Sequence, residues 1–197
     1  YARDNIKFVL CGMIPPETSG WFREEITSLD QLKGLKMRFF GVGAKVMQRF
    51  GVSTQQLAAA DIYPALERGT IDATEFSMPA IDITLGLNQI AKHNYYPGWH
   101  QQSTSNELLV NMDAWNDLTD AQRAMLNTSC DAQIAEMIAE GEAVQFQAMK
   151  DNVAAGVTLH RWPQEVLDQF KAAWEEVLAE ELAANPDSKK IWESEIK

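Results

Sequence analysis

The chain has 197 residues, of which 46% are hydrophobic and 23% charged, and its formal net charge at pH 7 is −11. This length and composition are those of a globular protein with one good-sized domain or two small ones. The acidic charge argues against nucleic acid and anionic membrane surfaces as partners, and no apolar stretch approaches the length of a membrane-spanning helix.

The first half of the chain alternates between short apolar runs and short amphipathic segments. A strand is expected at residues 6–10, and a loop rich in turn-forming residues follows at 15–20. The capping-box spacing at Ser28–Gln31 predicts a short helix that Gly34 closes. Strands and helices are then expected in the order strand 35–40, helix 44–50, strand 52–57, helix 61–68 and strand 71–76. This alternation is typical of βαβ units and predicts a parallel sheet.

The second half of the chain is mostly helical. The expected elements are a helix at 80–92, extended segments at 95–101 and 107–111, a long helix from 119 to about 152, a short strand at 157–160 and a helix that begins near Pro163. The last helix has one apolar stripe, formed by Val166, Phe170, Trp174 and Leu178. We therefore expect an α/β ligand-binding lobe over residues 1–111 and a helical region over residues 112–197.

The chain contains two cysteines, Cys11 and Cys130, far apart in the sequence. They either pair in an oxidising compartment or remain free buried thiols, and the residues alone leave both interpretations open. No CxxC, HExxH or Cys/His cluster occurs, so a structural zinc site is not expected.

Arg38 lies within the apolar run at residues 35–40, which is followed directly by Gly41-Val42-Gly43. Its guanidinium presents five donors in a planar fork that fits a carboxylate with two parallel hydrogen bonds. Judged from this run alone, Arg38 is more often an ordinary surface or ion-paired arginine than a ligand-binding one. The sequence has no GxSxG nucleophile motif and no complete dinucleotide fingerprint, so an enzyme is not expected.

Three segments, taken together, resemble one known family. Leu32–Arg38 (LKGLKMR), Ile62–Phe76 (IYPALERGTIDATEF) and the pair Tyr95–His100 and Glu107–Asn111 resemble segments of the periplasmic solute-binding proteins of TRAP transporters, the DctP-type family. The last pair is similar to the branch that binds 2-oxoacids, mannitol-type ligands and chloroaromatic carboxylates. Because the segments also match in order and spacing, the resemblance extends from about residue 11 to about residue 194.

The resemblance implies an α/β fold of the class II periplasmic-binding-protein type, with long C-terminal helices that pack across or between two lobes. It also implies a periplasmic location and TRAP membrane permease subunits as partners. A homodimer is expected for another reason, because a missing lobe leaves apolar area uncovered. Members of this family are usually longer, so the chain is expected to correspond to the C-terminal two-thirds, with the first lobe largely missing.

The resemblance also implies a binding site. Arg38 matches the arginine that holds the ligand carboxylate, while Trp21 and Phe22 are expected to wall the pocket. Trp99 either walls the pocket or packs in the core, and His100 is more simply a structural residue.

A bridging cation, Na⁺ or Ca²⁺, is expected beside the carboxylate, with no organic cofactor. Its implied ligands are Glu17, Glu75, the backbone carbonyl of Phe76 and Glu107. Glu17 stands where the family has glutamine, and the added negative charge favours a divalent ion. Glu75 and Glu107 are therefore expected to line the substrate site as well.

The expected function is that of an extracytoplasmic receptor for a small organic carboxylate, such as the 2-oxoacid pyruvate, that closes by a hinge motion. Two alternatives follow from the same residues. The chain is a lobe with little ligand binding of its own, or it is an enzyme that acts on a small organic acid with His100 or Glu107 as the base.

Overall fold

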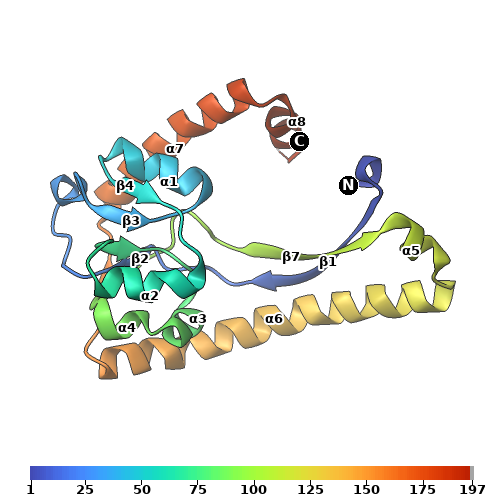
Figure 1. Cartoon of the computed structure of the whole chain (residues 1–197), viewed down its shortest axis with the longest axis horizontal. Helices are drawn as coiled ribbons and strands as arrows, with labels where there is room; N and C mark the ends of the chain where they lie inside the picture. The colour runs from blue at the N-terminus through green and yellow to red at the C-terminus, as the bar shows by residue number, and fades with distance from the viewer. Residues whose placement is uncertain (196–197) are drawn as a thin grey trace.

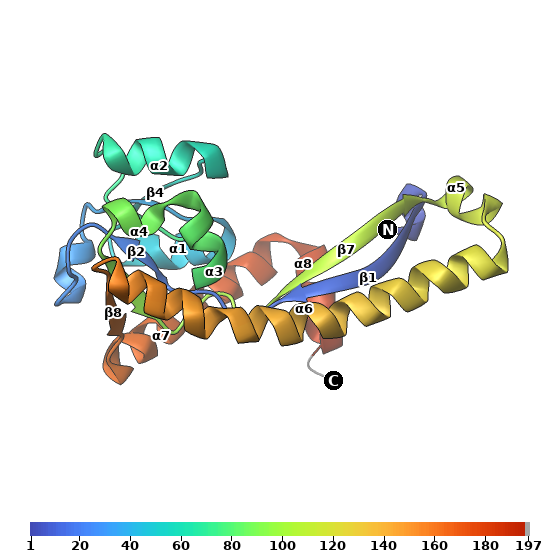
Figure 2. The same cartoon turned by 90° about the horizontal axis from the view of Figure 1, so that it is seen from below.

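The computed structural model describes residues 1–195 and has one α/β lobe with a long arm extending from it (Figure 1). The arm contains an antiparallel ribbon of two strands, which lies beside a long helix. The turned view shows the same arrangement from below (Figure 2). The arm is formed by β1 (Ile6–Ile14), β7 (Thr104–Asn111), α5 (Met112–Asp117) and much of α6 (Asp120–Ala154).

The lobe is built on a mixed six-stranded sheet of order β4-β3-β5-β2-β6-β8. Its strands are β2 (Gly20–Phe22), β3 (Lys36–Arg38), β4 (Ser53–Gln55), β5 (Ala73–Thr74), β6 (His93–Tyr96) and β8 (Thr158–Arg161). β3 is parallel to β4 and β5, which confirms the expected βαβ units. β2 was not expected as a strand, and it runs antiparallel to both of its neighbours, β5 and β6.

Helices cover both faces of this sheet. They are α1 (Gly41–Arg49), α2 (Ala59–Glu67), α3 (Pro79–Asp82), α4 (Leu87–Ile90) and α7 (Gln164–Ala184), with 3-10 turns at Ala2–Asp4, Leu29–Leu32 and Ile83–Leu85. α8 (Pro186–Glu195) packs against α7. The single helix expected at 80–92 is interrupted because Gly86 adopts the left-handed conformation, with φ of 71°. A helix at 186–195 was not expected.

The core consists of two main apolar clusters, one on each side of the sheet. Met37, Met47 and Phe170 belong to the cluster that packs with α1 and α7. Ile62 and Leu87 belong to the cluster that packs with α2 and α4. The sheet therefore carries a buried layer on each face, as parallel strands require.

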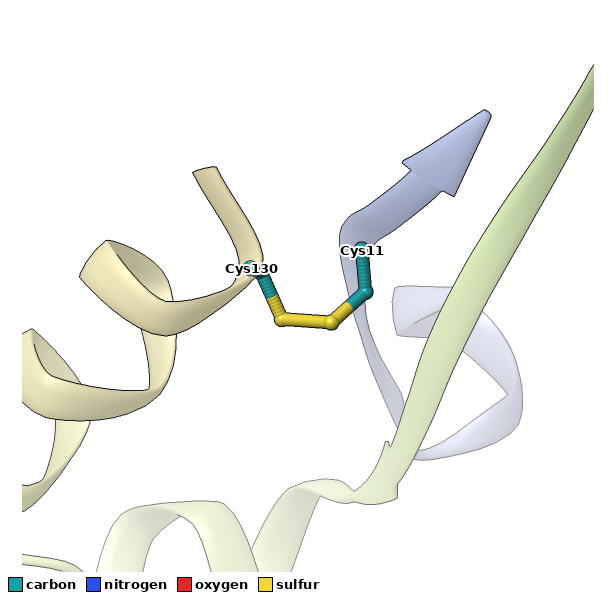
Figure 3. The surroundings of a disulfide bond; sticks show 2 residues. All are labelled: Cys11 and Cys130. Atoms are coloured by element: carbon teal, nitrogen blue, oxygen red, sulfur yellow. A yellow bond between two sulfur atoms is a disulfide. The ribbon is translucent and has the colours of Figure 1, made fainter. Parts of the chain in front are cut away.

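Helix α6 begins as the sequence predicts, because Thr119 and Gln122 form the capping box that satisfies its first backbone N–H groups. A disulfide joins Cys11 of β1 to Cys130 of α6 (Figure 3). Cys11 is the residue at which the register of the ribbon shifts, between Leu10 and Gly12. A Cβ on Gly12 would lie 2.5 Å from the sulfur of Met137, so the ribbon approaches α6 closely beside this bond.

Elements from both sides of residue 111 form the lobe. β8 completes one edge of the sheet, and α7 packs against α1. The division of the chain into a lobe and a helical region at residue 111 stays a prediction. Within residues 1–195, no helix combines the length and the apolar character needed to cross a membrane.

Candidate functional site

The site begins at the ends of two neighbouring parallel strands. Arg38 is the last residue of β3, and Glu75 directly follows β5. Because parallel strands end at the same edge of a sheet, the two side chains meet there. Arg38 Nη1 donates to Glu75 Oε2 at 2.8 Å, and the backbone N–H of Glu75 donates to the Arg38 carbonyl at 3.0 Å. The side chains are only 8% and 7% exposed, so this is a buried ion pair.

Two aromatic rings flank the Arg38 guanidinium. Its central carbon lies 4.1 Å from the ring centroid of Phe40 and 5.2 Å from that of Phe76. Burial lowers the pKa of Arg38 and Glu75 opposes that shift, but an arginine stays charged throughout the physiological range. The rings therefore hold a charged planar fork at the sheet edge.

Two loops bring further ionisable groups to this edge. Glu17 lies between β1 and β2, and His100 lies between β6 and β7. His100 Nε2 is 3.6 Å from both Glu17 Oε2 and Glu75 Oε1. One donor atom from each of the three residues lies within 4.8 Å of the others. Two carboxylates and an imidazole thus converge on one point beside Arg38.

The loop that carries His100 is held against the loop that carries Glu17. Gln101 Nε2 donates to Glu17 Oε1 at 2.8 Å, and the Glu17 N–H donates to the Gln101 carbonyl at 3.2 Å. A Cβ on Gly98 would collide with the backbone carbonyl of Glu17. The close approach of the two loops therefore requires glycine at position 98.

Burial and charge shift the pKa values of this cluster. Burial raises the pKa of Glu17, and the nearby His100 opposes that shift. Burial lowers the pKa of His100, but the Glu17 and Glu75 carboxylates outweigh it and leave the pKa raised. Glu17 Oε2 and both ring nitrogens of His100 have no hydrogen-bond partner among the described residues. Such buried polar atoms are uncommon, and a cation would satisfy Glu17 Oε2 and His100 Nε2.

A third buried carboxyl group lies behind the site. Asp82 of α3 accepts a hydrogen bond from Trp21 Nε1 at 2.7 Å. Burial raises the pKa of Asp82 to about 8, although the Trp21 bond opposes the shift. Asp82 is therefore predominantly protonated at pH 7 and adds little charge to the site.

The structure brings together four of the residues expected at the site, and not the others. Glu17, Arg38, Glu75 and Phe76 lie at the same edge of the sheet. Glu107 lies apart from them on the exposed face of β7, opposite Leu10, and its carboxylate accepts a hydrogen bond from the Tyr1 hydroxyl at 2.9 Å. Its position in the ribbon corrects the expectation that it is a ligand of the cation or of the substrate.

Two expected pocket walls are core residues. Successive side chains of a strand point to opposite faces, so Trp21 and Phe22 of β2 enter the two different core clusters. They are 0% and 1% exposed and do not wall a pocket. Trp99, for which both roles were open, packs against Phe39 and Phe170, and its ring also contacts His100.

His100 is the site residue that the sequence analysis treated as structural. The signal for it was weak, because a single histidine after a Pro-Gly-Trp turn carries no ligand spacing. Its position in a segment that already resembled a binding-protein family was the one available indication.

Comparison with known proteins gives a consistent result. Residues 16–185 match the family described as bacterial extracellular solute-binding protein, family 7. The chain is 35% identical to a monocarboxylate 2-oxoacid-binding periplasmic protein of Nostoc sp., over 98% of this chain and 53% of the relative. The chain thus spans about half the length of that curated relative.

Solved structures of TRAP solute-binding proteins share the fold. One from Bordetella bronchiseptica, with calcium and picolinate bound, matches with a TM-score of 0.90 and 38% identity over 98% of this chain and 57% of that one. One from Pseudoalteromonas atlantica, with sodium and pyruvate bound, matches with a TM-score of 0.86 and 31% identity over 98% and 59%. These relatives are solute-binding proteins and not enzymes.

Proposed function

The chain belongs to family 7 of the bacterial extracellular solute-binding proteins, and on this premise we propose that it binds a small monocarboxylate of the 2-oxoacid type. The observation that carries the proposal is Arg38, a buried guanidinium held between two aromatic rings at the carboxyl ends of parallel strands. Ligands of open α/β sheets bind at this edge.

Within the described residues, Arg38 donates hydrogen bonds from Nε and Nη1 and none from Nη2, so Nη2 is the donor left for a carboxylate. Glu75 engages Nη1 and thereby fixes the orientation of the guanidinium plane. Nη2 then serves the ligand carboxylate, which binds in the plane of the fork. A neutral analogue brings no negative charge to the buried Arg38 guanidinium, so the site selects for anionic ligands.

The remaining residues suit a bridging cation. The carboxylates of Glu17 and Glu75 and the backbone carbonyl of Phe76 are hard oxygen donors of the kind that Na⁺ and Ca²⁺ accept. A bound cation disfavours a second positive charge beside it, so His100 is neutral in the loaded site. With Asp82 protonated as well, two carboxylates and one guanidinium leave one net negative charge. A divalent cation and a monocarboxylate together bring this buried site to neutrality. When bound, the cation supplies a second positive contact for the ligand carboxylate and carries out no reaction.

The setting of the receptor is part of the proposal. The Cys11–Cys130 disulfide fits an oxidising compartment such as the bacterial periplasm, because cytosolic thiols are kept reduced. The relatives are named as periplasmic or TRAP proteins, which supports TRAP membrane permease subunits as the partners. A homodimer is part of the same proposal, and light scattering on the purified chain tests it.

Isothermal titration calorimetry tests the carboxylate site. Pyruvate is titrated into the chain with Ca²⁺ present and again with a chelator, and pyruvamide serves as the neutral analogue. We expect binding of pyruvate only, weakened by the chelator and abolished by Arg38→Ala. Lys36→Ala removes an exposed charge from the same strand and should leave binding unchanged. If no monocarboxylate binds, or if Arg38→Ala binds like the parent chain, the proposal is wrong.

A further inference from the structure

His100 is buried without any hydrogen bond. Its side chain is 6% exposed, and neither ring nitrogen has a partner among the described residues. An imidazole in this state loses its contacts with water and gains nothing in return, which costs free energy. The arrangement is therefore explained by a group that binds to the ring and does not belong to the protein chain.

Packing fixes the direction of the imidazole. The Phe39 ring lies edge-on to it at a centroid distance of 4.9 Å, and the Trp99 ring does the same at 5.4 Å. These rings enclose His100 and leave Nε2 directed at the Glu17 and Glu75 carboxylates. Nε2 is consequently preorganised toward the same point as the two carboxylate oxygens.

The distances from His100 Nε2 are too long for direct hydrogen bonds and close to those between two ligands of one metal ion. The two separations of 3.6 Å from Nε2 are too long for hydrogen bonds. Ligand atoms that share one ion at bond lengths of about 2.1 Å are separated by roughly 3 to 3.5 Å. Glu17 Oε2, which also lacks a partner, is one of the two oxygens concerned.

Glu75 divides its two oxygens between two neighbours. Oε2 pairs with Arg38 at 2.8 Å, while Oε1 is the oxygen that lies near His100. Arg38 thus orients the Glu75 carboxylate as an outer partner commonly orients a metal ligand. This leaves Oε1 free to coordinate.

We propose that His100 Nε2 joins Glu17 and Glu75 as a third side-chain ligand of the cation, so that the site prefers a transition-metal dication such as Mn²⁺ or Zn²⁺ to Ca²⁺ or Na⁺. The inference deepens the proposed function, because it concerns the cation of the same site. A nitrogen donor favours transition-metal ions, whereas Ca²⁺ and Na⁺ favour sites built only from oxygen. Solved relatives hold calcium or sodium, and the proposed preference differs from those ions.

A second pair of imidazoles in the chain must be removed from the experiment. His93 Nδ1 and His160 Nε2 are hydrogen-bonded at 2.9 Å, away from the site, and imidazole is a common Zn²⁺ ligand. The measurements are therefore made on the full chain with His93→Gln and His160→Gln in place. This background is compared with the same chain carrying His100→Gln in addition.

Two measurements test the proposal. Calorimetry with Zn²⁺, Mn²⁺ and Ca²⁺ on metal-stripped protein should show that His100→Gln weakens Zn²⁺ and Mn²⁺ binding about tenfold or more and changes Ca²⁺ binding much less. X-ray absorption of the Zn²⁺-loaded background chain should show imidazole scattering around the metal. This second measurement does not depend on whether the His100 variant folds.

Each outcome decides the question. Absence of imidazole scattering, tighter binding of Ca²⁺ than of Mn²⁺, or equal losses for all three ions would overturn the proposal. The proposed function fails separately: if pyruvate binds with Ca²⁺ through Arg38 while His100 is not a ligand, only this inference is wrong. If no carboxylate binds with any cation, the proposed function is wrong, whatever the metal spectrum shows.

Discussion

Arg38 Nη1 and Glu75 Oε2 lie 2.8 Å apart, and both side chains are more than nine-tenths buried. The pair joins the ends of β3 and β5, two strands brought together by the sheet and separated in sequence by α1, β4 and α2. A buried ion pair contributes little net stability, but the loss of one partner is costly because the other charge stays buried. Arg38 therefore has a structural role as well as the proposed binding role.

Replacement of Arg38 by methionine should lower the free energy of unfolding by about 3 kcal/mol or more, because the Glu75 carboxylate loses its partner. The double variant Arg38→Met/Glu75→Gln should recover much of that loss. Urea unfolding of the two single variants and the double variant at pH 7, without ligand, measures the coupling. If the two single effects simply add, Arg38 and Glu75 do not form the buried pair.

The Cys11–Cys130 disulfide closes a loop between residues 119 positions apart. By the loop-entropy relation, a bond of this span stabilises the folded state by roughly 4 to 5 kcal/mol. Cys11→Ser/Cys130→Ser should unfold at correspondingly lower urea concentration than the oxidised parent chain. Reductant should lower the stability of the parent chain and leave that of the double variant unchanged. A parent chain that does not respond after verified reduction would show that the bond contributes little.

Local signals in the sequence are sufficient for some of these elements. The start of α6 is predicted because its capping box, Thr119 and Gln122, is complete within four residues. β2 has only three residues, and its two partners come from elsewhere in the chain, so no local pattern identifies it. The interruption of the helix at Gly86 could have been predicted from the sequence, because glycine often ends a helix in the left-handed conformation.

The candidate site also contains some features that the sequence predicts and others that only the tertiary structure determines. Arg38 and Glu75 lie near the ends of predicted strands, so their meeting at one edge follows from the parallel topology. The direction of His100 depends on the packing of Phe39 and Trp99 around it, which only the tertiary structure determines. Glu107 was expected at the site because of the sequence motif around it. Which face of β7 its side chain occupies depends on how β7 pairs with β1, and the motif does not contain that information.

Asp82 should make stability fall as pH rises. Burial raises its pKa to about 8 in the folded state, whereas an unfolded aspartate titrates near 3.9. Between these two pH values, Asp82 is protonated in the folded chain and ionised in the unfolded chain. The contribution of Asp82 to stability is therefore full below about pH 4, decreases as the pH rises and is lost by about pH 8. The loss amounts to at most about 1.4 kcal/mol per pH unit.

Asp82→Asn removes this titration and keeps an oxygen that accepts from Trp21 Nε1. We measure the free energy of unfolding in urea from pH 4 to pH 8. The value for Asp82→Asn, relative to that of the parent chain, should increase steadily as the pH rises. Asp117→Asn removes an exposed carboxyl group of α5 and should leave the slope unchanged. Parallel pH profiles for Asp82→Asn and the parent chain would show that Asp82 is ionised in the folded state.

Gly98→Ala should damage the site itself. The added Cβ would collide with the Glu17 carbonyl, so either Glu17 or the segment that carries His100 must move. We expect weaker binding of both the cation and pyruvate in calorimetry. Gly34→Ala is the matched control, because its φ of 79° costs about 1 kcal/mol of stability but its Cβ meets no neighbouring atom. Equal affinity in the two variants would show that the loop contact does not position Glu17.

Glu17→Gln should change the charge of the cation that supports carboxylate binding. The substitution keeps an oxygen ligand and removes one negative charge, so a monovalent cation, the ligand carboxylate, Glu75 and Arg38 now sum to zero. We expect pyruvate titrations to show a clear preference for a divalent ion over Na⁺ in the parent chain, and a much smaller one in the variant. Glu107→Gln, at the exposed position on β7, should bind like the parent chain. If Glu107→Gln shifts the preference and Glu17→Gln does not, the cation is held by the ribbon and not at the edge of the sheet.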